Sequence, residues 1–265
     1  ITIRESLPYF LVAVAVLIIV HEGAHGVAAR FEGIKVKSAG VLLIAIIPGG
    51  FVEPDEEEFR RAKVGSRLRV LAAGSTANMA LALLIIPIIL GLFHPSGILI
   101  GGVLDGSPIQ DAGVKPGTVI EYVNDVRVVS LDDFRRQMAE VQVGSEVKLG
   151  VRFENGTFKV LTVKTMADPN NPDRAILGIT RASNYFHHLP VYLTLFWLHF
   201  WSLNIAIFNM LPIYPLDGEG IIYNLAEKFL GRKSRIIRWT LTGFYIALLA
   251  LNIGLTFGRF GFISV

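Results

Sequence analysis

The sequence predicts a polytopic α-helical membrane protein with about four spans, a membrane-embedded β-hairpin and an inserted small β-rich domain. Of its 265 residues, 52% are hydrophobic and only 18% are charged, and the mean hydropathy is +0.53, a composition typical of membrane proteins. A bilayer-spanning helix needs about 20 predominantly apolar residues. Four stretches meet this requirement, at Leu7–Ala29, Leu68–Phe93, Leu189–Leu211 and Ile236–Phe257.

A fifth apolar stretch, Gly40–Phe51, is too short to span a bilayer and contains Pro48-Gly49-Gly50. It predicts a strand or a re-entrant hairpin. Such backbone is tolerated at membrane depth only where protein or a water-filled cavity covers it. The acidic run that follows, Glu53–Glu58, predicts a solvated loop.

The segment from Gly97 to Arg181 has a different pattern, in which short β-type runs are broken by Gly, Pro, Asn and Asp. One amphipathic helix is predicted at Leu131–Met138, with Ser130 as its N-cap. We therefore expect a β-rich domain at 97–181, inserted between two parts of a membrane core at 1–95 and 186–265. The predicted strands are Ile98–Val103, Val119–Val123, Glu146–Phe153 and Thr157–Val163.

Composition also excludes several classes of site. The chain has no cysteine, so it has neither disulfides nor thiolate metal ligands. Its formal net charge is only +3, and no basic stripe is interleaved with aromatic residues, so nucleic-acid binding has no support. The first residue is Ile1 rather than Met, which leaves room for residues or a further helix upstream.

The loops at 30–69 and 218–238 are rich in Lys and Arg and fall on one side of the predicted membrane core. The positive-inside rule places these loops in the cytoplasm and the inserted domain outside the cytoplasm. This topology describes a multi-pass protein of the cell membrane.

The first span continues into His21-Glu22-Gly23-Ala24-His25, near its predicted cytoplasmic end. Residues four apart lie on the same helix face, so both imidazoles can reach one metal ion. Glu22 lies about 100° around the helix, where it can reach a metal-bound water instead. The alternative is a polar patch buried between packed helices.

A third ligand is predicted where the third span ends, at the same membrane depth. Pro212 and Pro215 interrupt the helix before Asp217-Gly218. Two histidines, an aspartate and an open position for water form the pattern of a catalytic zinc site. Alternatively, Asp217 only caps a helix that begins near Gly218.

Other polar residues have simpler interpretations. His199 is predicted to be an interfacial or packed histidine, about 27 Å along a helix from Asp217. Asn78 follows small residues within a span and either supports helix packing or contributes to the site. The remaining histidines are expected to be solvated: His94, His187 and His188.

These motifs resemble those of the site-2 protease family, the intramembrane zinc metalloproteases of peptidase family M50. The resemblance rests on His21-Glu22-Gly23-Ala24-His25, Gly74-x-x-x-Asn78 and Asn209-x-x-Pro212-x-x-Pro215-Leu216-Asp217-Gly218. It implies one zinc ion per chain, held by His21, His25 and Asp217, with Glu22 as general base. Asn78 and Asn209 are implied to orient the substrate or to line the site. The Gly40–Phe51 segment, including Gly49 and Gly50, resembles the family's hairpin, whose edge pairs with an unwound substrate.

The inserted domain resembles a PDZ domain of the permuted bacterial kind. Ile98–Val103, Gly106-Ser107-Pro108 and Ala112-Gly113-Val114-Lys115-Pro116-Gly117 follow its pattern, although Thr118 stands where Asp is commoner. Ala175–Ile179 resembles its carboxylate-binding strand. A peptide would then add beside Ile176, Leu177 and Gly178, next to the predicted helix. Alternatively, this strand only closes the sheet.

The resemblance implies hydrolysis of peptide bonds in transmembrane segments, with lipid bilayer around the enzyme and substrates already cut on the outer side. Two other functions remain open. A catalytically inactive scaffold would use its PDZ-like domain to bind protein tails. A metal transporter would use the histidines and the aspartate as a transit site, although such a protein favours polar residues spaced through the membrane depth.

Overall fold

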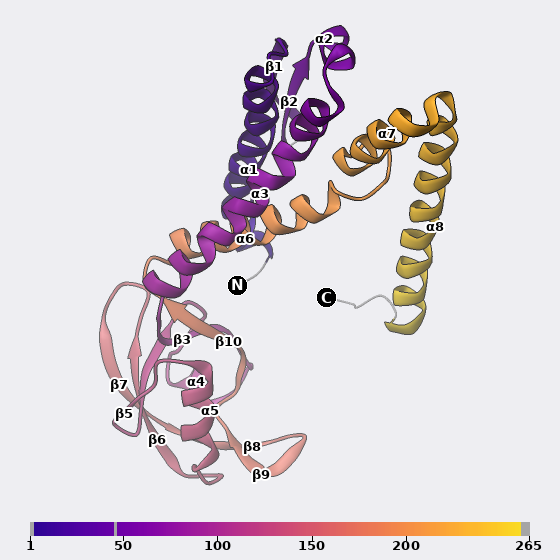
Figure 1. Cartoon of the computed structure of the whole chain (residues 1–265). Helices are drawn as coiled ribbons and strands as arrows, with labels where there is room; N and C mark the ends of the chain where they lie inside the picture. Colours follow the sequence, from indigo (N-terminus) through magenta and orange to yellow (C-terminus); the bar gives the residue numbers. More distant parts are fainter. Residues whose placement is uncertain (1–2, 45–46, 261–265) are drawn as a thin grey trace. The chain divides into compact units, whose positions relative to one another are not determined.

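The computed structural model describes residues 3–44 and 47–260 of the chain (Figure 1). The chain divides into two compact units. One unit is Ile88–Leu193 together with the start of the chain to Ser6, and it contains the β-rich domain. The other unit comprises Leu7–Pro87 and Thr194–Val265, and it contains most of the membrane helices.

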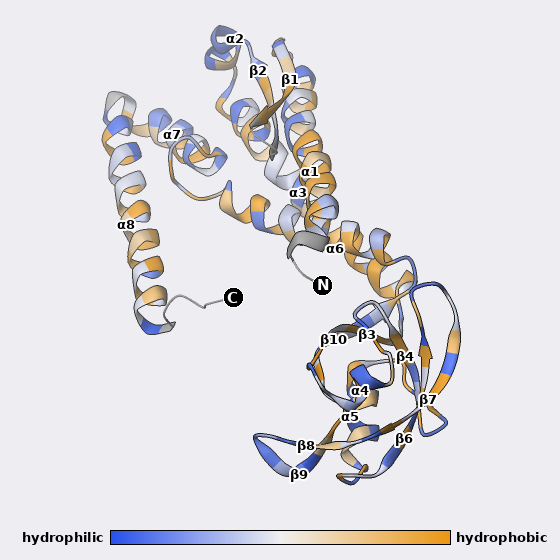
Figure 2. Cartoon of the chain, turned by 180° about the vertical axis from the view of Figure 1, so that it is seen from behind, coloured by the Kyte–Doolittle hydropathy of each residue, from blue (hydrophilic) through white to orange (hydrophobic). Residues whose placement is uncertain are grey.

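Within the described residues, four helices are long and apolar enough to cross a membrane, as predicted. In Figure 2 much of the ribbon of these helices has the orange colour of hydrophobic residues. Only 6% of the most apolar window of the last helix is buried within the protein, as expected for side chains that face lipid. Some helices extend past their predicted ends, because polar and charged residues such as Ser66 and Arg67 belong to a helix that hydropathy alone does not detect. The four helices are α1 (Ile3–Phe31), α3 (Val64–Leu92), α6 (Leu189–Phe208) and α8 (Ser234–Phe260).

The short apolar stretch forms an antiparallel hairpin of β1 (Val36–Ile44) and β2 (Ile47–Pro54). This confirms the predicted hairpin, although both strands extend beyond Gly40–Phe51, and residues 45–46 lie outside the described part. The hairpin packs against α1 through positions where glycine leaves room. A Cβ at Gly50 would lie 2.7 Å from Ile18 Cγ2, so the backbone of β2 contacts the face of α1 directly.

The expectation of a solvated loop at Glu53–Glu58 was wrong. Glu53 belongs to β2, and helix α2 spans Glu56–Arg61. Asp55 caps α2 by accepting a hydrogen bond from the Glu58 backbone N–H at 2.9 Å. Three glutamates in its first turn and two arginines in its last turn complement the helix dipole. Two i,i+4 ion pairs join Glu56 to Arg60 and Glu57 to Arg61.

The other unit contains a six-stranded sheet in the order β10-β3-β4-β6-β7, with β5 paired to β4. Its core is a cluster of fully buried aliphatic side chains, including Ile98, Ile120 and Leu149. The predicted helix is α5 (Leu131–Ala139), and Ser130 and Asp133 form a capping box at its start. The strands are β3 (Pro95–Val103), β4 (Val119–Val123), β5 (Val126–Arg127), β6 (Glu146–Arg152), β7 (Phe158–Lys164) and β10 (Ile179–Phe186).

Five elements of this unit were not predicted, and two of them are the sheet strands β5 and β10. The other three, a short helix α4 and a separate two-stranded hairpin of β8 and β9, are too short for the periodicity of their sequence to be recognised. These elements span Pro108–Asp111 (α4), Met166–Asp168 (β8) and Asn171–Ile176 (β9).

The third span ends at Phe208, and an irregular segment with a cis peptide bond at Tyr214-Pro215 leads to α7 (Asp217–Leu230). A 3-10 turn, Gly231–Lys233, connects α7 to α8. Asp217 is the first residue of α7 and Leu216 is its N-cap. Asp217 is therefore not the N-cap of α7, which was the alternative to its role as a metal ligand.

Candidate metal centre

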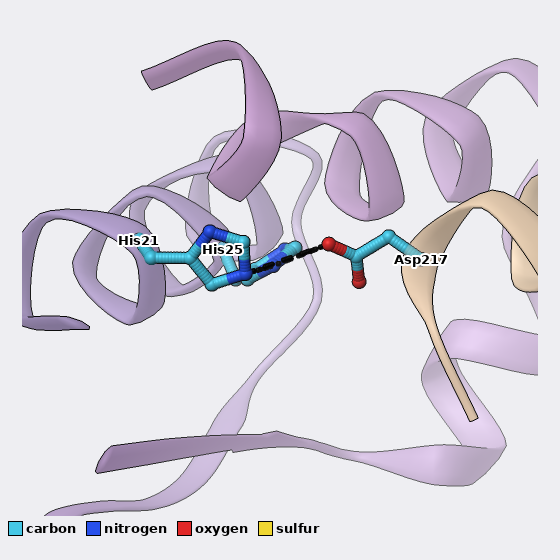
Figure 3. A group of neighbouring side chains, drawn as sticks. All are labelled: His21, His25 and Asp217. Carbon is cyan, nitrogen blue, oxygen red and sulfur yellow. Dashed lines mark hydrogen bonds and ion pairs between the residues drawn. The ribbon is translucent and has the colours of Figure 1, made fainter. Parts of the chain in front are cut away.

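Two histidines of α1 and the first residue of α7 converge on one point (Figure 3). The Nε2 atoms of His21 and His25 lie 3.2 Å apart. Asp217 Oδ2 lies 3.5 Å from His21 Nε2 and 3.4 Å from His25 Nε2. Among the residues that the structure describes, this is the group of His, Asp and Glu side chains that could hold a metal ion.

The spacing of the three ligand atoms fits a tetrahedral zinc site. Ligands at about 2.0–2.1 Å from zinc are separated by about 3.3–3.5 Å along the edges of a tetrahedron. The three observed separations are 3.2, 3.4 and 3.5 Å. The nitrogen and oxygen donors are also of the kinds that catalytic zinc prefers, and three of them leave a fourth position open.

Helix α3 packs closely against the two imidazoles because it has a glycine at the contact. A Cβ at Gly74 would lie 2.6 Å from His21 Cε1 and would overlap the His25 ring as well. One turn away, the carbonyl of Val70 accepts a hydrogen bond from His25 Nδ1 at 2.7 Å. Asn78, a further turn along, lies 3.2 Å from His21 Nδ1. The Gly74-x-x-x-Asn78 element thus contacts the histidines directly.

The backbone positions Asp217 through a second close contact. The N–H of Gly218 donates to the Asn209 carbonyl at 2.7 Å. A Cβ at Gly218 would collide with the Met210 backbone, so only glycine permits this approach. Burial raises the pKa of Asp217, but the hydrogen bonds that its carboxylate accepts from His21 and His25 outweigh this effect and lower the pKa to about 2. Its side chain is therefore a carboxylate at neutral pH, as a metal ligand must be.

A buried ion pair joins the ligand-bearing helix α7 to α8. Glu219 is 4% exposed, and it accepts a hydrogen bond from Arg238 Nε at 2.6 Å. The Arg238 guanidinium also lies 3.8 Å from the centroid of the Tyr223 ring. These contacts hold the first turns of α7, which begin at Asp217, against α8.

Two cavities adjoin the cluster, and both are lined by His21, Glu22 and Asn209. The first, of about 440 Å³, is lined by both polar and apolar residues, and its polar residues also include His25, Glu56 and Asp217. The second, of about 410 Å³, lies between α1, the hairpin and α6. Its other lining residues are mostly apolar: Phe10, Val14, Leu17, Ile18, Pro48, Gly49, Gly50, Trp201 and Ile205.

The structure brings most of the predicted site residues together. The Asn209 amide nitrogen lies 3.1 Å from His21 Nε2. A Cβ at Gly50 would lie 3.3 Å from Glu22 Cγ, so the hairpin backbone passes beside the candidate general base. His199 is a packed histidine, and its Nδ1 lies 2.9 Å from the Ala82 carbonyl oxygen.

Several residues of the site were not predicted, among them Val70, Ser75 and Trp201. Val70 contributes a backbone carbonyl, which no sequence pattern reveals. Ser75 Oγ lies 3.5 Å from Asp217 Oδ2, and its place beside Gly74 was the available signal. Trp201 is four residues from Ile205 on α6, and both line the apolar cavity. That i,i+4 spacing was visible, but an apolar span offers many such pairs.

The three predicted peptide-binding residues of the β-rich unit have different environments. Ile176 ends β9, whereas Leu177 and Gly178 belong to no strand, so Ala175–Ile179 is not one continuous strand. Leu177 is 3% exposed and packs in the domain core. A cavity of about 400 Å³ lies beside α5 and is lined by Phe134, Met138 and residues of β9.

Comparison with known proteins identifies the family to which the chain belongs. The model of peptidase family M50 matches residues 9–251, which include the histidine motif, the hairpin and Asp217.

Relatives differ in how much of their length the chain spans. An uncharacterized protein of Methanocaldococcus jannaschii is 30% identical over 86% of this chain and 60% of its own length. A putative zinc metalloprotease of Clostridium perfringens is 25% identical over 85% of this chain and 89% of its own length. A membrane-bound transcription factor site-2 protease homolog of Arabidopsis thaliana is 30% identical, but the match covers 47% of this chain and 26% of that protein. The chain therefore spans less than two thirds of the archaeal and plant relatives.

Among solved structures, the PDZ domain of an SdrC-like protein from Listeria monocytogenes is 22% identical to the matched part of this chain. The match covers 32% of this chain and 86% of that domain, with a TM-score of 0.29.

Proposed function

Because the chain belongs to peptidase family M50 and is a multi-pass membrane protein, we propose that it is an intramembrane zinc metalloendopeptidase of the site-2 protease type. It would hydrolyse peptide bonds within transmembrane segments of membrane proteins. The observation that carries this proposal is the near-tetrahedral spacing of His21 Nε2, His25 Nε2 and Asp217 Oδ2. Relatives named as zinc metalloproteases and a site-2 protease homolog support it.

In this proposal His21, His25 and Asp217 hold one zinc ion per chain. Bound zinc lowers the pKa of a coordinated water towards about 7 and polarises a scissile carbonyl. Glu22 takes the proton of the attacking water and passes it to the leaving amine. The Asn209 amide, 3.1 Å from His21 Nε2, donates a hydrogen bond to the substrate carbonyl.

The substrate must unwind before it can be cut, since every backbone carbonyl within a transmembrane helix is already hydrogen-bonded. An unwound segment would add as a strand to the edge of the β1–β2 hairpin, beside Gly49 and Gly50. There it would lie against the apolar cavity that adjoins Glu22 and the histidines. We propose that this cavity receives an apolar side chain next to the scissile bond.

The remaining assignments follow the topology expected from the basic loops. The membrane core comprises 1–95 and 186–265, with the active site near the cytoplasmic side. The PDZ-like domain at 97–181 is extracytoplasmic and engages substrates already cut on the outer side, with Ile176, Leu177 and Gly178 as peptide-binding residues.

A reconstituted cleavage assay tests the function. We expect the purified chain in lipid nanodiscs to cut a model substrate with one apolar span, at a bond inside that span. 1,10-Phenanthroline should abolish cleavage and added zinc should restore it. The substrate should be tested both with and without its outer domain. If the chain holds stoichiometric zinc yet cuts neither form, it is a catalytically inactive scaffold.

Narrowing the apolar cavity should change specificity. We expect Val14→Phe to lower kcat/KM for a substrate with Leu beside the scissile bond about 10-fold more than for one with Ala, because large side chains no longer fit. Val16→Phe is the matched control, since Val16 lies two residues along α1, is 38% exposed and is not among the cavity residues. Equal effects of both variants on both substrates would remove the cavity from substrate selection.

A further inference from the structure

The two candidate histidine ligands face a matching set of residues on α3. His21 and His25 are four residues apart on α1, and Asn78, Gly74 and Val70 are spaced by four on α3. His21 contacts Asn78, whereas His25 contacts Val70. The two helices therefore run antiparallel at the site. In each histidine Nε2 faces Asp217, and Nδ1 contacts a residue of α3.

These contacts matter because a neutral imidazole carries its proton on only one nitrogen. A metal bound at Nε2 requires the proton on Nδ1, and a hydrogen-bond acceptor at Nδ1 favours that tautomer. For His25 the acceptor is the Val70 carbonyl, 2.7 Å from Nδ1. A carbonyl oxygen can only accept, so this contact sets the tautomer that leaves Nε2 free for metal.

For His21 the corresponding group is the side-chain amide of Asn78. Its Nδ2 lies 3.2 Å from His21 Nδ1, while its Oδ1 is buried without a hydrogen-bond partner. The two ends of an amide have the same shape, and rotating this one by 180° brings Oδ1 to His21 Nδ1. The rotated amide accepts the Nδ1 proton through Oδ1, and its NH2 group takes the former place of the oxygen.

We propose that Asn78 is a positioning residue for the metal ligand His21 and does not contact substrate. It acts as the acceptor that keeps the His21 proton on Nδ1. The inference rests on the proposed zinc site. It departs from the substrate-orienting role that the family resemblance implies for this residue.

Burial separates Asn78 from the residues that can meet substrate. Asn78 is 0% exposed and is not among the residues that line either cavity beside the metal centre, whereas Asn209 lines both. Asn78 lies behind the His21 ring, so substrate would have to displace the imidazole to reach it.

Zinc affinity, measured by competition with a chromogenic chelator, tests this role without an activity assay. We expect Asn78→Leu, which has similar volume and no acceptor, to bind zinc about 10–100-fold more weakly than wild type. Asn78→Asp should bind at least as tightly as wild type, because a carboxylate can only accept at Nδ1. The d–d absorption spectrum of the cobalt-loaded protein should change in Asn78→Leu and stay close to wild type in Asn78→Asp. Asn209→Leu, the matched control, should bind zinc no more weakly than wild type.

Three results would overturn the proposal. Wild-type zinc affinity in Asn78→Leu, with a raised KM, would identify Asn78 as a substrate contact. Weakened zinc binding in Asn78→Asp would mean that His21 needs the amide N–H, and this variant decides the matter even if Asn78→Leu does not fold. Absence of stoichiometric zinc from the wild type would overturn the proposed function itself, and the inference with it.

Discussion

Replacing Glu22 with glutamine is expected to lower the turnover number for a spanning substrate by about 10²–10⁴-fold, the usual contribution of a general acid–base. Glutamine has nearly the shape of glutamate but cannot take a proton from water. Zinc content should not change, because His21, His25 and Asp217 form the ligand cluster and Glu22 is not part of it. Elemental analysis and single-turnover cleavage of the same preparation measure both quantities together.

Glu56→Gln is the matched control for this variant. Glu56 lines the same 440 Å³ cavity as Glu22, but its side chain is 77% exposed and pairs with Arg60 on α2. Its loss should therefore change turnover less than about twofold, since an exposed i,i+4 ion pair contributes only about 0.3–0.5 kcal/mol to stability. Full cleavage by Glu22→Gln would refute the general-base role, and any function that persists without cleavage would favour the scaffold.

Replacing Asp217 with alanine is expected to remove most of the bound zinc from the purified protein. Two histidines would remain, and the third coordination position would be empty. The loss of affinity should exceed the roughly 10–100-fold that loss of an outer hydrogen-bond partner costs. Inductively coupled plasma mass spectrometry of wild type and variant, purified side by side, measures it.

Asp217→Asn separates the ligand role from the structural one. It keeps the size of the side chain and the start of α7, where an acidic residue otherwise stabilises the helix by about 0.3–1 kcal/mol. We expect this variant to fold like wild type, by circular dichroism, and still to bind zinc at least about 10-fold more weakly, because a neutral amide is a poorer ligand than a carboxylate. Stoichiometric, tightly held zinc in Asp217→Ala would exclude this residue from the metal centre.

The sequence by itself determined those features that depend on length, hydropathy and local spacing. Four spans follow from stretches of about 20 apolar residues, and the hairpin follows from a shorter apolar stretch that contains Pro48-Gly49-Gly50. The spacing of His21 and His25 placed both imidazoles on one helix face. The cap of α5 was likewise local, since Ser130 and Asp133 are three residues apart.

Local pattern failed where structure depended on charge pairs or on distant contacts. The acidic run Glu53–Glu58 has the polarity of a loop, but its last three glutamates begin α2, where Arg60 and Arg61 form i,i+4 ion pairs with Glu56 and Glu57. The hydrogen bond from His25 to the Val70 carbonyl was also beyond the sequence, because backbone groups carry no residue signature.

Only the tertiary structure decided which distant groups meet, since contacts between residues far apart in the chain are set by packing. It brought Asp217 within 3.5 Å of a histidine almost two hundred residues earlier, and it left room at Gly74 and Gly218 for the approach. It also placed Asn78 beside His21 Nδ1 and Asn209 beside the cavities, although the family resemblance implied for both asparagines that they orient the substrate or line the site.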